Sequence, residues 1–433
     1  MNISTLYQVF KKHPNISTDS RNCPENSIFF ALKGDSFNGN QFACSALEQG
    51  AAFAVIDEKR YQKADDPRYI LVNNVLETLQ QLANYHRRQL GTRIIAITGT
   101  NGKTTTKELV AAVLGKTHNV LYTEGNLNNH IGVPKTLLRL TAEHDIAVFE
   151  MGANHPGEIK QLAEIAEPNF GLITNVGIAH IEGFGSFEGV VQTKGELYDY
   201  LRTQKKAVAF IQNNNEHLRA ISDGLILARY AVGWQDDLFA AGEVIDCTPF
   251  LNFKWRHANW EWQEVHTKLV GTYNIDNLLA AIAIGCYFEV PIKQINDALE
   301  SYTPSNNRSQ LMETSDNKLI IDAYNANPTS MSAAITNFRQ MAAEHKMVIL
   351  GDMKELGEVS QKEHLKIIEI LQTANFEEVW LVGEEFAKAQ SSFRHFANVE
   401  EVKAEIDKKK PKNFHILIKG SNSTKLFQLP TSL

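Results

Sequence analysis

The sequence contains few cysteines, and none is placed as one of a redox pair or as part of a metal site. Its four cysteines stand far apart, with no CxxC pair: Cys23, Cys44, Cys247 and Cys286. Such spacing excludes the usual cysteine-based zinc site and is typical of a reducing compartment. Long apolar runs are missing too, because no stretch approaches the ~20 residues that a membrane-spanning helix needs.

A signal sequence and an excess of basic residues are also absent. Residues 1–5 contain no basic residue leading into an apolar run, so no signal peptide is predicted. The 43 lysines and arginines are outnumbered by 50 aspartates and glutamates, which gives a formal net charge of -7. A general nucleic-acid-binding protein would usually carry a basic face. We therefore expect a cytoplasmic protein of 433 residues, long enough for two or three domains, that binds neither nucleic acid nor a membrane.

The most informative stretch that is present is residues 93–114, where a short apolar strand leads into a glycine-rich turn and a helix. Gly99 and Gly102 lie in the turn, and apolar side chains recur at helical spacing after it. Backbone N–H groups of such a turn face phosphates, and the helix dipole favours the anion. Lys103 is placed to reach the β- and γ-phosphates, and the Thr104 hydroxyl to bind Mg²⁺. The Gly-x-x-Gly-Lys-Thr spacing is two residues shorter than in the common phosphate loop.

Polar side chains end the next two strands. Residues 145–150 are apolar up to Glu150, and residues 170–176 lead to His180. Ligands gather at the carboxyl ends of strands in an open parallel sheet, so both side chains are expected near the phosphates. Glu150 could hold Mg²⁺ directly or through water. A lone histidine is often structural, and both roles remain open for His180.

The pattern of strands, helices and loops predicts three α/β blocks, with boundaries at 1–90, 91–304 and 305–433. In the second block, alternating aromatic-rich segments over residues 243–270 predict an antiparallel meander. The polar, proline-marked residues 303–309 predict a boundary. The third block alternates strands and helices, which predicts a parallel, doubly wound sheet. The predicted strands are 27–32, 52–56, 94–97, 145–150, 170–176, 318–322, 346–350, 378–382 and 414–418. The predicted helices are 41–49, 75–90, 278–288, 292–302, 329–343, 361–373 and 399–407.

Several motifs together resemble one family, the Mur ligases, which are ATP-dependent enzymes that build the peptide of bacterial peptidoglycan. Residues 98–106 (TGTNGKTTT) resemble the ATP loop of the family, and residues 125–134 (GNLNNHIGVP) resemble its next segment on the substrate side. The resemblance covers all three blocks. It implies an α/β fold of three domains, with a central P-loop ATPase domain of mostly parallel sheet and a Rossmann-like carboxyl-terminal domain.

Within the family, four stretches resemble the ligases that add D-alanyl-D-alanine to UDP-N-acetylmuramoyl-tripeptide. They are residues 150–159 (EMGANHPGEI), 179–185 (AHIEGFG), 322–331 (DAYNANPTSM) and 350–357 (LGDMKELG). The implied reaction forms an amide through an acyl phosphate. The nearest alternative is the preceding ligase, which adds a diamino acid, but its typical Asp-Asn-Pro-Arg motif is not found in this sequence. A folylpolyglutamate-synthase-like ligase, a generic P-loop ATPase and a catalytically silent nucleotide-binding module are further alternatives.

The resemblance also implies roles for residues of the ATP and metal sites. ATP and two Mg²⁺ ions are the implied cofactors, with Thr104 and Glu150 at the first ion. His180 and Lys194, the latter matching a carbamylated lysine of the family, would serve the second. Without the resemblance, Lys194 would be interpreted as a solvated lysine on a helix. The implied nucleotide-binding residues are Gly99, Thr100, Asn101, Gly102, Lys103, Thr104, Thr105, Asn274, Asn277, Arg308 and Asp322.

The substrate residues are expected in two other places. Ser20 and Arg21 are candidates for the diphosphate of the UDP-sugar, and the loop with Lys33, Ser36 and Asn38 for its uracil. Without the resemblance, both loops would be interpreted as solvated turns. Asn128 is expected on the acceptor side, and Asn325 and Asn327 near D-alanyl-D-alanine. No residue is identified that recognises the third residue of the tripeptide, and a monomer is expected.

Overall fold

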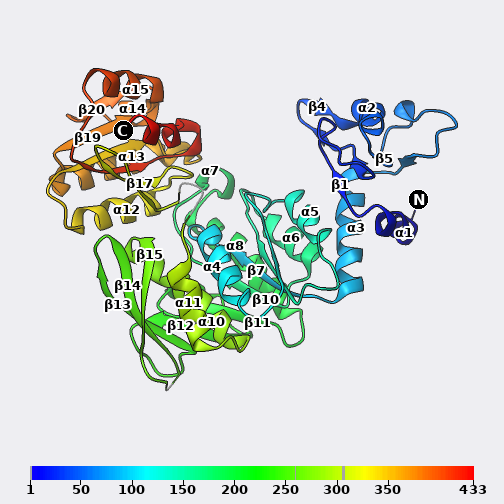
Figure 1. Ribbon diagram of the computed structural model, residues 1–433, viewed down its shortest axis with the longest axis horizontal. Helices are drawn as coiled ribbons and strands as arrows, with labels where there is room; N and C mark the ends of the chain where they lie inside the picture. Colours follow the sequence, from blue (N-terminus) through cyan, green and yellow to red (C-terminus); the bar gives the residue numbers. More distant parts are fainter. Residues whose placement is uncertain (1, 259, 305–307) are drawn as a thin grey trace.

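The computed structural model describes residues 2–258, 260–304 and 308–433, and it contains three α/β units along a bent molecule (Figure 1). The amino-terminal and carboxyl-terminal units lie at the two ends and are joined through the middle unit. Residues 305–307, which belong to the predicted boundary segment, lie outside the described residues.

The first unit is built on a small parallel sheet in the order β1-β2-β5-β6, beside an antiparallel ribbon of β3 and β4. The strands are β1 (Ile16–Ser17), β2 (Ile28–Phe30), β3 (Lys33–Gly34), β4 (Phe37–Asn38), β5 (Phe53–Ile56) and β6 (Tyr69–Leu71). The helices are α1 (Ile3–Lys12), α2 (Ala43–Glu48) and α3 (Val75–Leu90), with 3-10 turns at Gly39–Phe42 and Lys59–Tyr61. The predicted helix over 41–49 is therefore split, because its first turn is 3-10.

Helix α3 attaches the first unit to the second. Four of its side chains make hydrogen bonds to backbone carbonyl groups of the middle unit: Gln80, Asn84, His86 and Arg87. The Arg87 Nε group donates to Ala166 O at 2.9 Å, the His86 Nε2 atom lies 2.9 Å from Leu140 O, and the Gln80 amide donates to His130 O at 3.0 Å. Apolar residues of both units also form one continuous core cluster. These contacts fix the position of α3 between the first and second units.

The second unit contains a nine-stranded sheet in the order β15-β14-β13-β12-β11-β10-β7-β9-β8. The neighbouring strands β12, β11, β10, β7, β9 and β8 pair in parallel. The pairs β13–β14 and β14–β15 are antiparallel, as the aromatic-rich pattern predicts. The strands are β7 (Arg93–Thr98), β8 (Val120–Tyr122), β9 (Ile146–Glu150), β10 (Phe170–Ile173), β11 (Val208–Gln212), β12 (Ile226–Val232), β13 (Ala240–Cys247), β14 (Phe250–His257) and β15 (Gln263–Val270). The helices are α4 (Lys103–Leu114), α5 (Gly132–Leu137), α6 (Glu158–Ala166), α7 (Ile181–Phe184), α8 (Phe187–Arg202), α9 (Glu216–Ala220), α10 (Ile275–Tyr287) and α11 (Ile292–Ser301).

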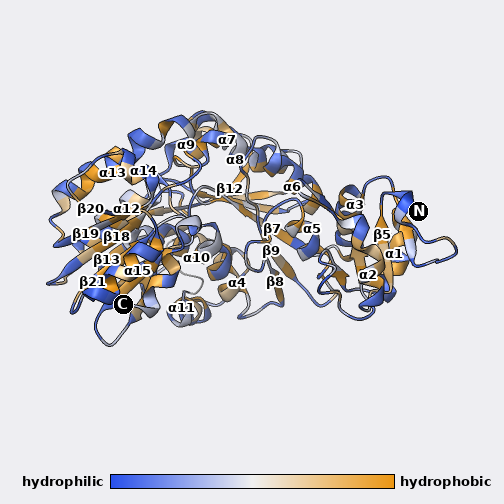
Figure 2. Ribbon diagram, turned by 90° about the horizontal axis from the view of Figure 1, so that it is seen from above, coloured by the Kyte–Doolittle hydropathy of each residue, from blue (hydrophilic) through white to orange (hydrophobic). Residues whose placement is uncertain are grey.

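Strand β7 is buried on both faces, which explains its continuous apolar sequence. Because side chains alternate across a strand, Ile94 and Ala96 join the core beneath α6 and α8, and Ile95 and Ile97 join the core beneath α4 and α10. Figure 2 shows β7 and β9 as apolar strands in the interior of the middle unit. The strand is thereby fixed from both sides, and the loop that follows it begins at a fixed point.

The third unit has a six-stranded sheet in the order β16-β17-β21-β18-β19-β20. Four predicted strands are found, but the sheet is not purely parallel, because the edge strand β16 pairs antiparallel with β17. The strands are β16 (Gln310–Glu313), β17 (Lys318–Asp322), β18 (Lys346–Gly351), β19 (Glu378–Val382), β20 (Arg394–Phe396) and β21 (His415–Lys419). The helices are α12 (Pro328–Gln340), α13 (Ser360–Ala374), α14 (Glu384–Lys388) and α15 (Val399–Lys408).

Strand β10 is shorter than predicted. The sequence pattern predicts a strand over residues 170–176, but β10 ends at Ile173. Thr174 and Asn175 instead make hydrogen bonds to the turn after β7. The Thr100 N–H group, for example, donates to Asn175 O at 2.9 Å. Tertiary hydrogen bonds thus replace the last ladder bonds of this strand.

Within the described ranges, no helix combines the length and the apolar character that crossing a lipid bilayer requires.

The antiparallel strands β13, β14 and β15 provide a direct test of how the core of the second unit is packed. Trp255 of β14 is 0% exposed, and its Nε1 group donates to Asn296 Oδ1 at 2.9 Å. Truncation to alanine leaves a large cavity and an unpaired amide, so Trp255→Ala should lower the free energy of unfolding by about 3–5 kcal/mol. A urea titration followed by circular dichroism measures the change. The control is Trp260→Ala, at a side chain that is 48% exposed, which should change stability by less than about 1 kcal/mol. Equal effects of the two changes would contradict the described packing.

Candidate active site

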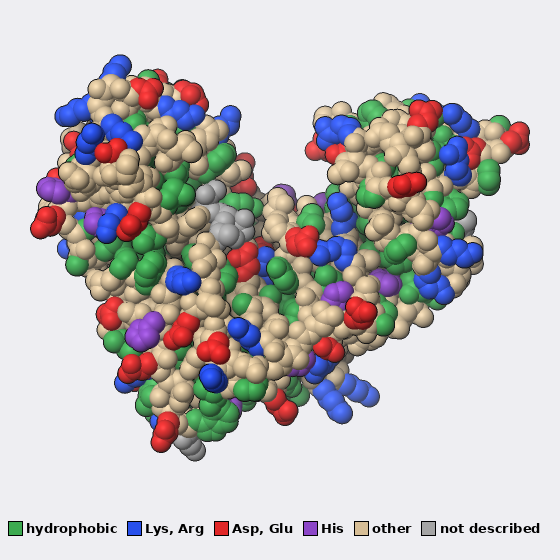
Figure 3. Space-filling view, in the orientation of Figure 1, with side chains coloured by type: hydrophobic (Ala, Val, Ile, Leu, Met, Phe, Trp, Pro, Cys, Tyr) green, Lys and Arg blue, Asp and Glu red, His purple; other side chains and the backbone are tan. Residues whose placement is uncertain are grey.

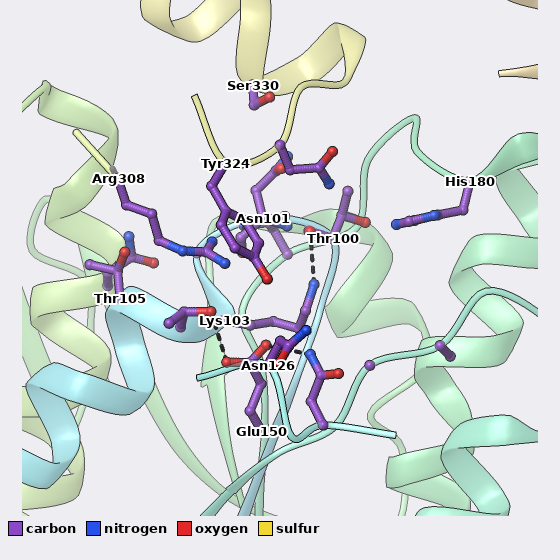
Figure 4. Close-up of a pocket in the computed structure, with 18 of the residues that line it drawn as sticks. Thr100, Asn101, Lys103, Thr105, Asn126, Glu150, His180, Arg308, Tyr324 and Ser330 are labelled. Carbon is purple, nitrogen blue, oxygen red and sulfur yellow. Dashed lines mark hydrogen bonds between the residues drawn. The ribbon is translucent and has the colours of Figure 1, made fainter. Parts of the chain in front are cut away.

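A cavity of about 590 Å³ lies between the second and third units. Figure 3 shows a broad notch between the first and third units, above the middle unit, and Figure 4 shows side chains that line the cavity. The turn after β7 and the end of β9 form its floor, and the loop after β17 covers it from the third unit. Of the residues predicted from sequence, the cavity is lined by Thr100, Asn101, Gly102, Lys103, Thr104, Thr105, Asn128, Glu150, His180, Asn274, Asn277, Arg308, Asp322 and Asn325.

The turn that joins β7 to α4 requires its two glycines. Gly99 has a φ of +140° and Gly102 a φ of +79°, both in the region that favours glycine. A Cβ atom on Gly99 would lie 2.0 Å from the Thr174 hydroxyl oxygen, and one on Gly102 would lie 2.4 Å from Asn277 Oδ1. Both glycines therefore permit a close approach as well as an unusual backbone angle. Gly99 does not line the cavity; it packs behind the turn.

Only part of this turn has free N–H groups for an anion. The N–H groups of Thr100 and Asn101 donate to the backbone oxygen and side-chain oxygen of Asn175, at 2.9 and 3.0 Å. The first N–H groups of α4, which begins at Lys103, have no acceptor within the helix. An anion would thus be held by the start of α4, where the helix dipole also favours negative charge.

Lys103 closes the turn upon itself. Its Nζ atom donates to Gly99 O at 2.7 Å and to Thr100 O at 3.0 Å. Burial lowers the pKa of Lys103, although the carboxylate of Glu150 acts in the opposite direction. In these two contacts the ammonium group binds carbonyl oxygens and no carboxylate. Because a charged acceptor makes a stronger hydrogen bond, a phosphate would be a more favourable partner.

Thr104 and Glu150 lie together on the floor of the cavity. The Thr104 hydroxyl donates to Glu150 Oε2 at 2.8 Å, and the Asn128 amide donates to Glu150 Oε1 at 2.8 Å. Glu150 is 3% exposed. The described residues contain no cluster of three or more His, Cys, Asp or Glu side chains suited to a metal ion. A hydroxyl and one carboxylate nevertheless match Mg²⁺, which commonly takes one or two protein oxygens and completes its shell with phosphate and water.

His180 and Lys194 both lie beside the Phe184 ring but in different surroundings. The His180 ring points toward the turn after β7 in Figure 4, and its Nδ1 atom lies 2.5 Å from Glu355 Oε2 of the third unit without hydrogen-bond geometry. This contact lowers the pKa of Glu355. Lys194 on α8 does not line the cavity. Its Nζ atom lies 3.5 Å from Ala153 O and 5.0 Å from the ring centre of Phe184, whose ring centroid is 6.1 Å from that of His180.

Lys194 is buried rather than solvated. The side chain is 2% exposed, and burial together with the charge of Lys103 lowers its pKa to about 7. A large share of the amine is then uncharged near neutral pH, in contrast to a surface lysine.

Asn274 and Asn277 form a buried network at the start of α10. The Asn274 amide donates to Val270 O at 2.9 Å, the Asn277 amide donates to Asn274 Oδ1 at 2.9 Å, and Asn277 Oδ1 accepts from the Thr106 hydroxyl at 3.0 Å. Asn274 stands at the N-cap position of α10, but its side chain makes no capping hydrogen bond to the helix. Asn277 instead packs against Gly102 and supports the turn from below.

The third unit contributes two pairs of charged or aromatic side chains. The Arg308 guanidinium carbon lies 3.9 Å from the ring centre of Tyr324, and Figure 4 shows Arg308 above the turn after β7. The Lys419 ammonium donates to Asp322 Oδ2 at 2.5 Å and is 1% exposed. Asp322 is thereby neutralised from the side of its own sheet, with one carboxylate oxygen left for another donor.

Asn325 and Asn327 differ in position. Asn325 lines the cavity, and its Oδ1 atom accepts from the N–H group of Ala326 at 2.9 Å. Asn327 does not line it; its side chain caps α12 and its Nδ2 group donates to Asn101 Oδ1 at 2.7 Å. The structure therefore brings Asn325 to the predicted site and gives Asn327 a protein partner.

The predicted residues of the first unit do not line this cavity, and several are engaged with neighbours. Arg21 makes a two-pronged pair with Asp19, at 2.9 and 2.8 Å. Lys33 lies 2.9 Å from Asp57 and 3.1 Å from Glu58, whose Oε1 atom also accepts from the Asn38 amide. The remaining two predicted residues of this unit, Ser20 and Ser36, lie half-buried and exposed in the same two loops.

Sequence reasoning missed several residues that line the cavity. Tyr324 follows β17, Lys419 ends β21, and Asn175 follows β10, so all three lie at carboxyl ends of strands. The rule that ligands gather at this edge of a sheet could have found them. Tyr273 was also missed; its hydroxyl lies 2.8 Å from the Ser309 hydroxyl and connects the second and third units.

Family models match each of the three units. The Mur ligase family catalytic domain matches residues 13–87, the Mur ligase middle domain matches residues 97–285, and the Mur ligase glutamate ligase domain matches residues 307–422. The matched segments together cover most of the chain.

Named relatives resemble the chain over nearly its whole length. The UDP-N-acetylmuramoyl-tripeptide–D-alanyl-D-alanine ligase of Haemophilus influenzae is 35% identical, over 96% of this chain and 93% of that protein. The enzyme of the same name from Bacillus subtilis is 34% identical, over 88% of this chain and 82% of that protein. A crystal structure of MurF from Acinetobacter baumannii superposes with a TM-score of 0.88 at 28% identity, covering 100% of this chain and 98% of that one. The predicted three-domain fold is thereby confirmed, and the chain belongs to the Mur ligase family.

Proposed function

We propose that this protein is an ATP-dependent ligase that joins D-alanyl-D-alanine to the free carboxylate of UDP-N-acetylmuramoyl-tripeptide. One observation carries the proposal. A single cavity combines an anion-binding turn, the Thr104–Glu150 pair and polar side chains of a second unit that faces them. The names of the relatives support the choice of substrates.

We assign one task to each unit. Residues 1–90 would bind the UDP-sugar, residues 91–304 would bind ATP, and residues 305–433 would bind the incoming dipeptide and complete the ATP site. The first assignment gives Ser20 and Arg21 to the diphosphate, and Lys33, Ser36 and Asn38 to uracil. The ion pairs of Arg21 and Lys33 would have to rearrange for this to occur.

The chemistry requires an activated acyl group, because a carboxylate oxygen is a poor leaving group and its carbon is a weak electrophile. An oxygen of the tripeptide carboxylate attacks the γ-phosphorus atom of ATP, which gives an acyl phosphate and ADP. The amine of D-alanyl-D-alanine then attacks the acyl carbon, loses a proton, and expels inorganic phosphate. Phosphoryl transfer chiefly needs positioning and charge neutralisation, which a preformed polar cavity supplies.

The residues of the chain divide this work. Lys103 would leave the carbonyl oxygens of Gly99 and Thr100 and bind the β- and γ-phosphates, together with the first N–H groups of α4. Arg308, held over the turn by Tyr324, would place a second cation at the γ-phosphate. Asp322 would use its remaining carboxylate oxygen on the ribose, and Asn274 and Asn277 would lie at the adenine.

Magnesium fits the donor set of the cavity floor. Thr104 and Glu150 supply hard oxygen ligands, and Asn128 holds the carboxylate in position. When bound, the ion would reduce the repulsion between phosphate and carboxylate, which is ~4 kcal/mol per pair of unit charges at 4 Å and an effective dielectric near 20.

Lys194 fits the role of a carbamate. Its uncharged amine can add CO₂ and lose a proton, which gives a carbamate anion. The surroundings favour the uncharged amine that this reaction needs, because Nζ is buried and its described contacts include no carboxylate within ion-pair distance. The carbamate and His180 would then serve a second Mg²⁺ from the side of the cavity near Ala153.

The alternatives are less well supported. The named relatives add D-alanyl-D-alanine, so the ligase that adds a diamino acid is not favoured. A generic ATPase or a silent nucleotide-binding module would not need Arg308, Asp322 and Tyr324 to converge on the cavity from a separate unit. Because the substrates include ATP and a UDP-sugar, we propose that the enzyme acts in the cytoplasm, as a monomer.

The substrate assignment is tested by phosphate release. With ATP, Mg²⁺ and UDP-N-acetylmuramoyl-tripeptide, the purified protein should release phosphate steadily only when D-alanyl-D-alanine is added. Diaminopimelate or lysine in its place should give less than about a hundredth of that rate, because neither would provide the second amino acid of the dipeptide. Release that ignores D-alanyl-D-alanine would overturn the assignment.

The carbamate is tested by chemical rescue. Lys194→Ala should lower kcat by at least about a hundredfold, and added formate or acetate should restore part of it by occupying the place of the carbamate. Lys160→Ala is the matched control, since Lys160 is an exposed lysine on the neighbouring helix α6, and it should keep normal activity with no response to either anion. Full activity of untreated Lys194→Ala protein would reject the role.

A further inference from the structure

We propose that Asn101 and Asn327 form a positioning pair through which docking of the third unit fixes the phosphate-binding turn in its active conformation. Its kinetic consequence rests on the proposed ligase function, but the contact itself does not. The pair connects the turn after β7 with the first residues of α12, two segments separated by 226 positions in the sequence.

Asn327 is held in one orientation by α12. Its Oδ1 atom accepts from the N–H group of Ser330 at 2.9 Å, and its own N–H group donates to the Ser330 hydroxyl at 3.2 Å, which completes a capping box. The Nδ2 group then points away from the helix and donates to Asn101 Oδ1 at 2.7 Å. Asn327 is 4% exposed, so this donor has little access to water.

Asn101 is held just as firmly on the other side. Its N–H group donates to Asn175 Oδ1 at 3.0 Å, and its carbonyl oxygen accepts from the Thr174 hydroxyl at 2.6 Å and the Asn175 amide at 3.0 Å. The backbone of Asn101 is therefore committed to the end of β10. Only its side chain remains, and it reaches the third unit.

A shift at Asn101 would pass directly to the anion-binding groups. The next residue, Gly102, has a φ of +79° and packs so closely on Asn277 that no Cβ atom would fit. Lys103, with the first N–H group of α4, follows at once. The turn is thus held by three asparagines: Asn175 from the loop after β10, Asn277 from α10 and Asn327 from the third unit.

A second contact places α12 on a neighbouring loop of the middle unit. The N–H group of Ile178 donates to the Thr329 hydroxyl at 3.3 Å, and a Cβ atom on Gly177 would lie 2.9 Å from that hydroxyl oxygen. The start of α12 therefore contacts both the turn after β7 and the loop after β10. Movement of the third unit away from the middle unit would break these contacts together.

Two amide groups suit this task because each offers a donor and an acceptor. The second bond of the pair, from Asn101 Nδ2 to Asn327 Oδ1, is longer at 3.4 Å. Loss of one partner leaves the polar atoms of the other without their mate in a site with little water. One N–H of the Asn327 amide is used by Asn101, and its oxygen is used by the N–H group of Ser330, so the role that these contacts support is to position the turn.

A double-mutant cycle tests the pair. Asn327→Ser keeps a side-chain oxygen for the N-cap but removes the amide, and Asn101→Ala removes the other partner. In the otherwise unchanged enzyme, N327S should lower kcat about tenfold and leave the KM for UDP-N-acetylmuramoyl-tripeptide unchanged. In the N101A background, N327S should change kcat by less than about twofold. Equal factors in both backgrounds, or no loss in N327S, would overturn the proposal.

The matched control is Asn398→Ser, which makes the same change at the N-cap of α15. Asn398 caps that helix through Glu400 and Glu401 and has no amide partner in the second unit among its described contacts. N398S should keep the normal kcat. A loss equal to that of N327S would assign the effect to capping and overturn the proposed pairing.

Hydrogen exchange gives a second readout that does not depend on catalysis or on how well N327S folds. N101A, a change in the middle unit, should speed exchange of the Ser330 amide across the unit boundary and leave α15 unchanged. Unchanged exchange at Ser330 would overturn the proposal. If the unaltered protein forms no product with D-alanyl-D-alanine, the proposed function fails, and the exchange measurement still decides the pairing.

Discussion

The structure depends on a turn of four residues, 99–102, that is held mainly by groups outside it. Gly99 and Gly102 permit its backbone angles, but glycine alone specifies no conformation. Asn175 takes up two of its N–H groups, and Asn277 fills the space beside Gly102. The buried strand β7 fixes where the turn begins, and α4 fixes where it ends. The first N–H groups of α4 are therefore already placed for an anion, with Lys103 beside them, and such positioning is the main requirement of phosphoryl transfer.

The second feature of the site is its division between units. Thr104 and Glu150 lie in the middle unit, whereas Arg308, Asp322 and Tyr324 belong to the third unit. Charges at the site are arranged accordingly: Lys419 neutralises part of Asp322, Tyr324 supports Arg308, and the Lys103 ammonium binds two carbonyl groups of its own turn. A site built in this way is complete only when the units are docked, so the contacts that dock them contribute to catalysis.

The sequence predicted those parts that depend on local patterns. Strand β17, strand β19 and helix α3 begin and end where their apolar periodicity does, and the turn with Lys103 and Thr104 was recognised because its residues are contiguous. Contacts between distant segments could not be predicted in this way. The pairs Asp322–Lys419 and Arg308–Tyr324 require the order of strands in a sheet, which spacing alone does not give. Lys194 was interpreted as a solvated lysine from its residue type, and only packing against Phe184 reveals its burial.

One cavity should bring the γ-phosphate of ATP within reach of the tripeptide carboxylate, and transfer of an oxygen isotope between them would show this. UDP-N-acetylmuramoyl-tripeptide labelled with ¹⁸O in its reacting carboxylate would be converted with D-alanyl-D-alanine, and the released phosphate analysed by mass spectrometry. If the carboxylate attacks ATP, each released phosphate should carry one ¹⁸O atom from the substrate. Phosphate without the label would show that water, and not the carboxylate, accepts the phosphoryl group, and would contradict the proposed reaction.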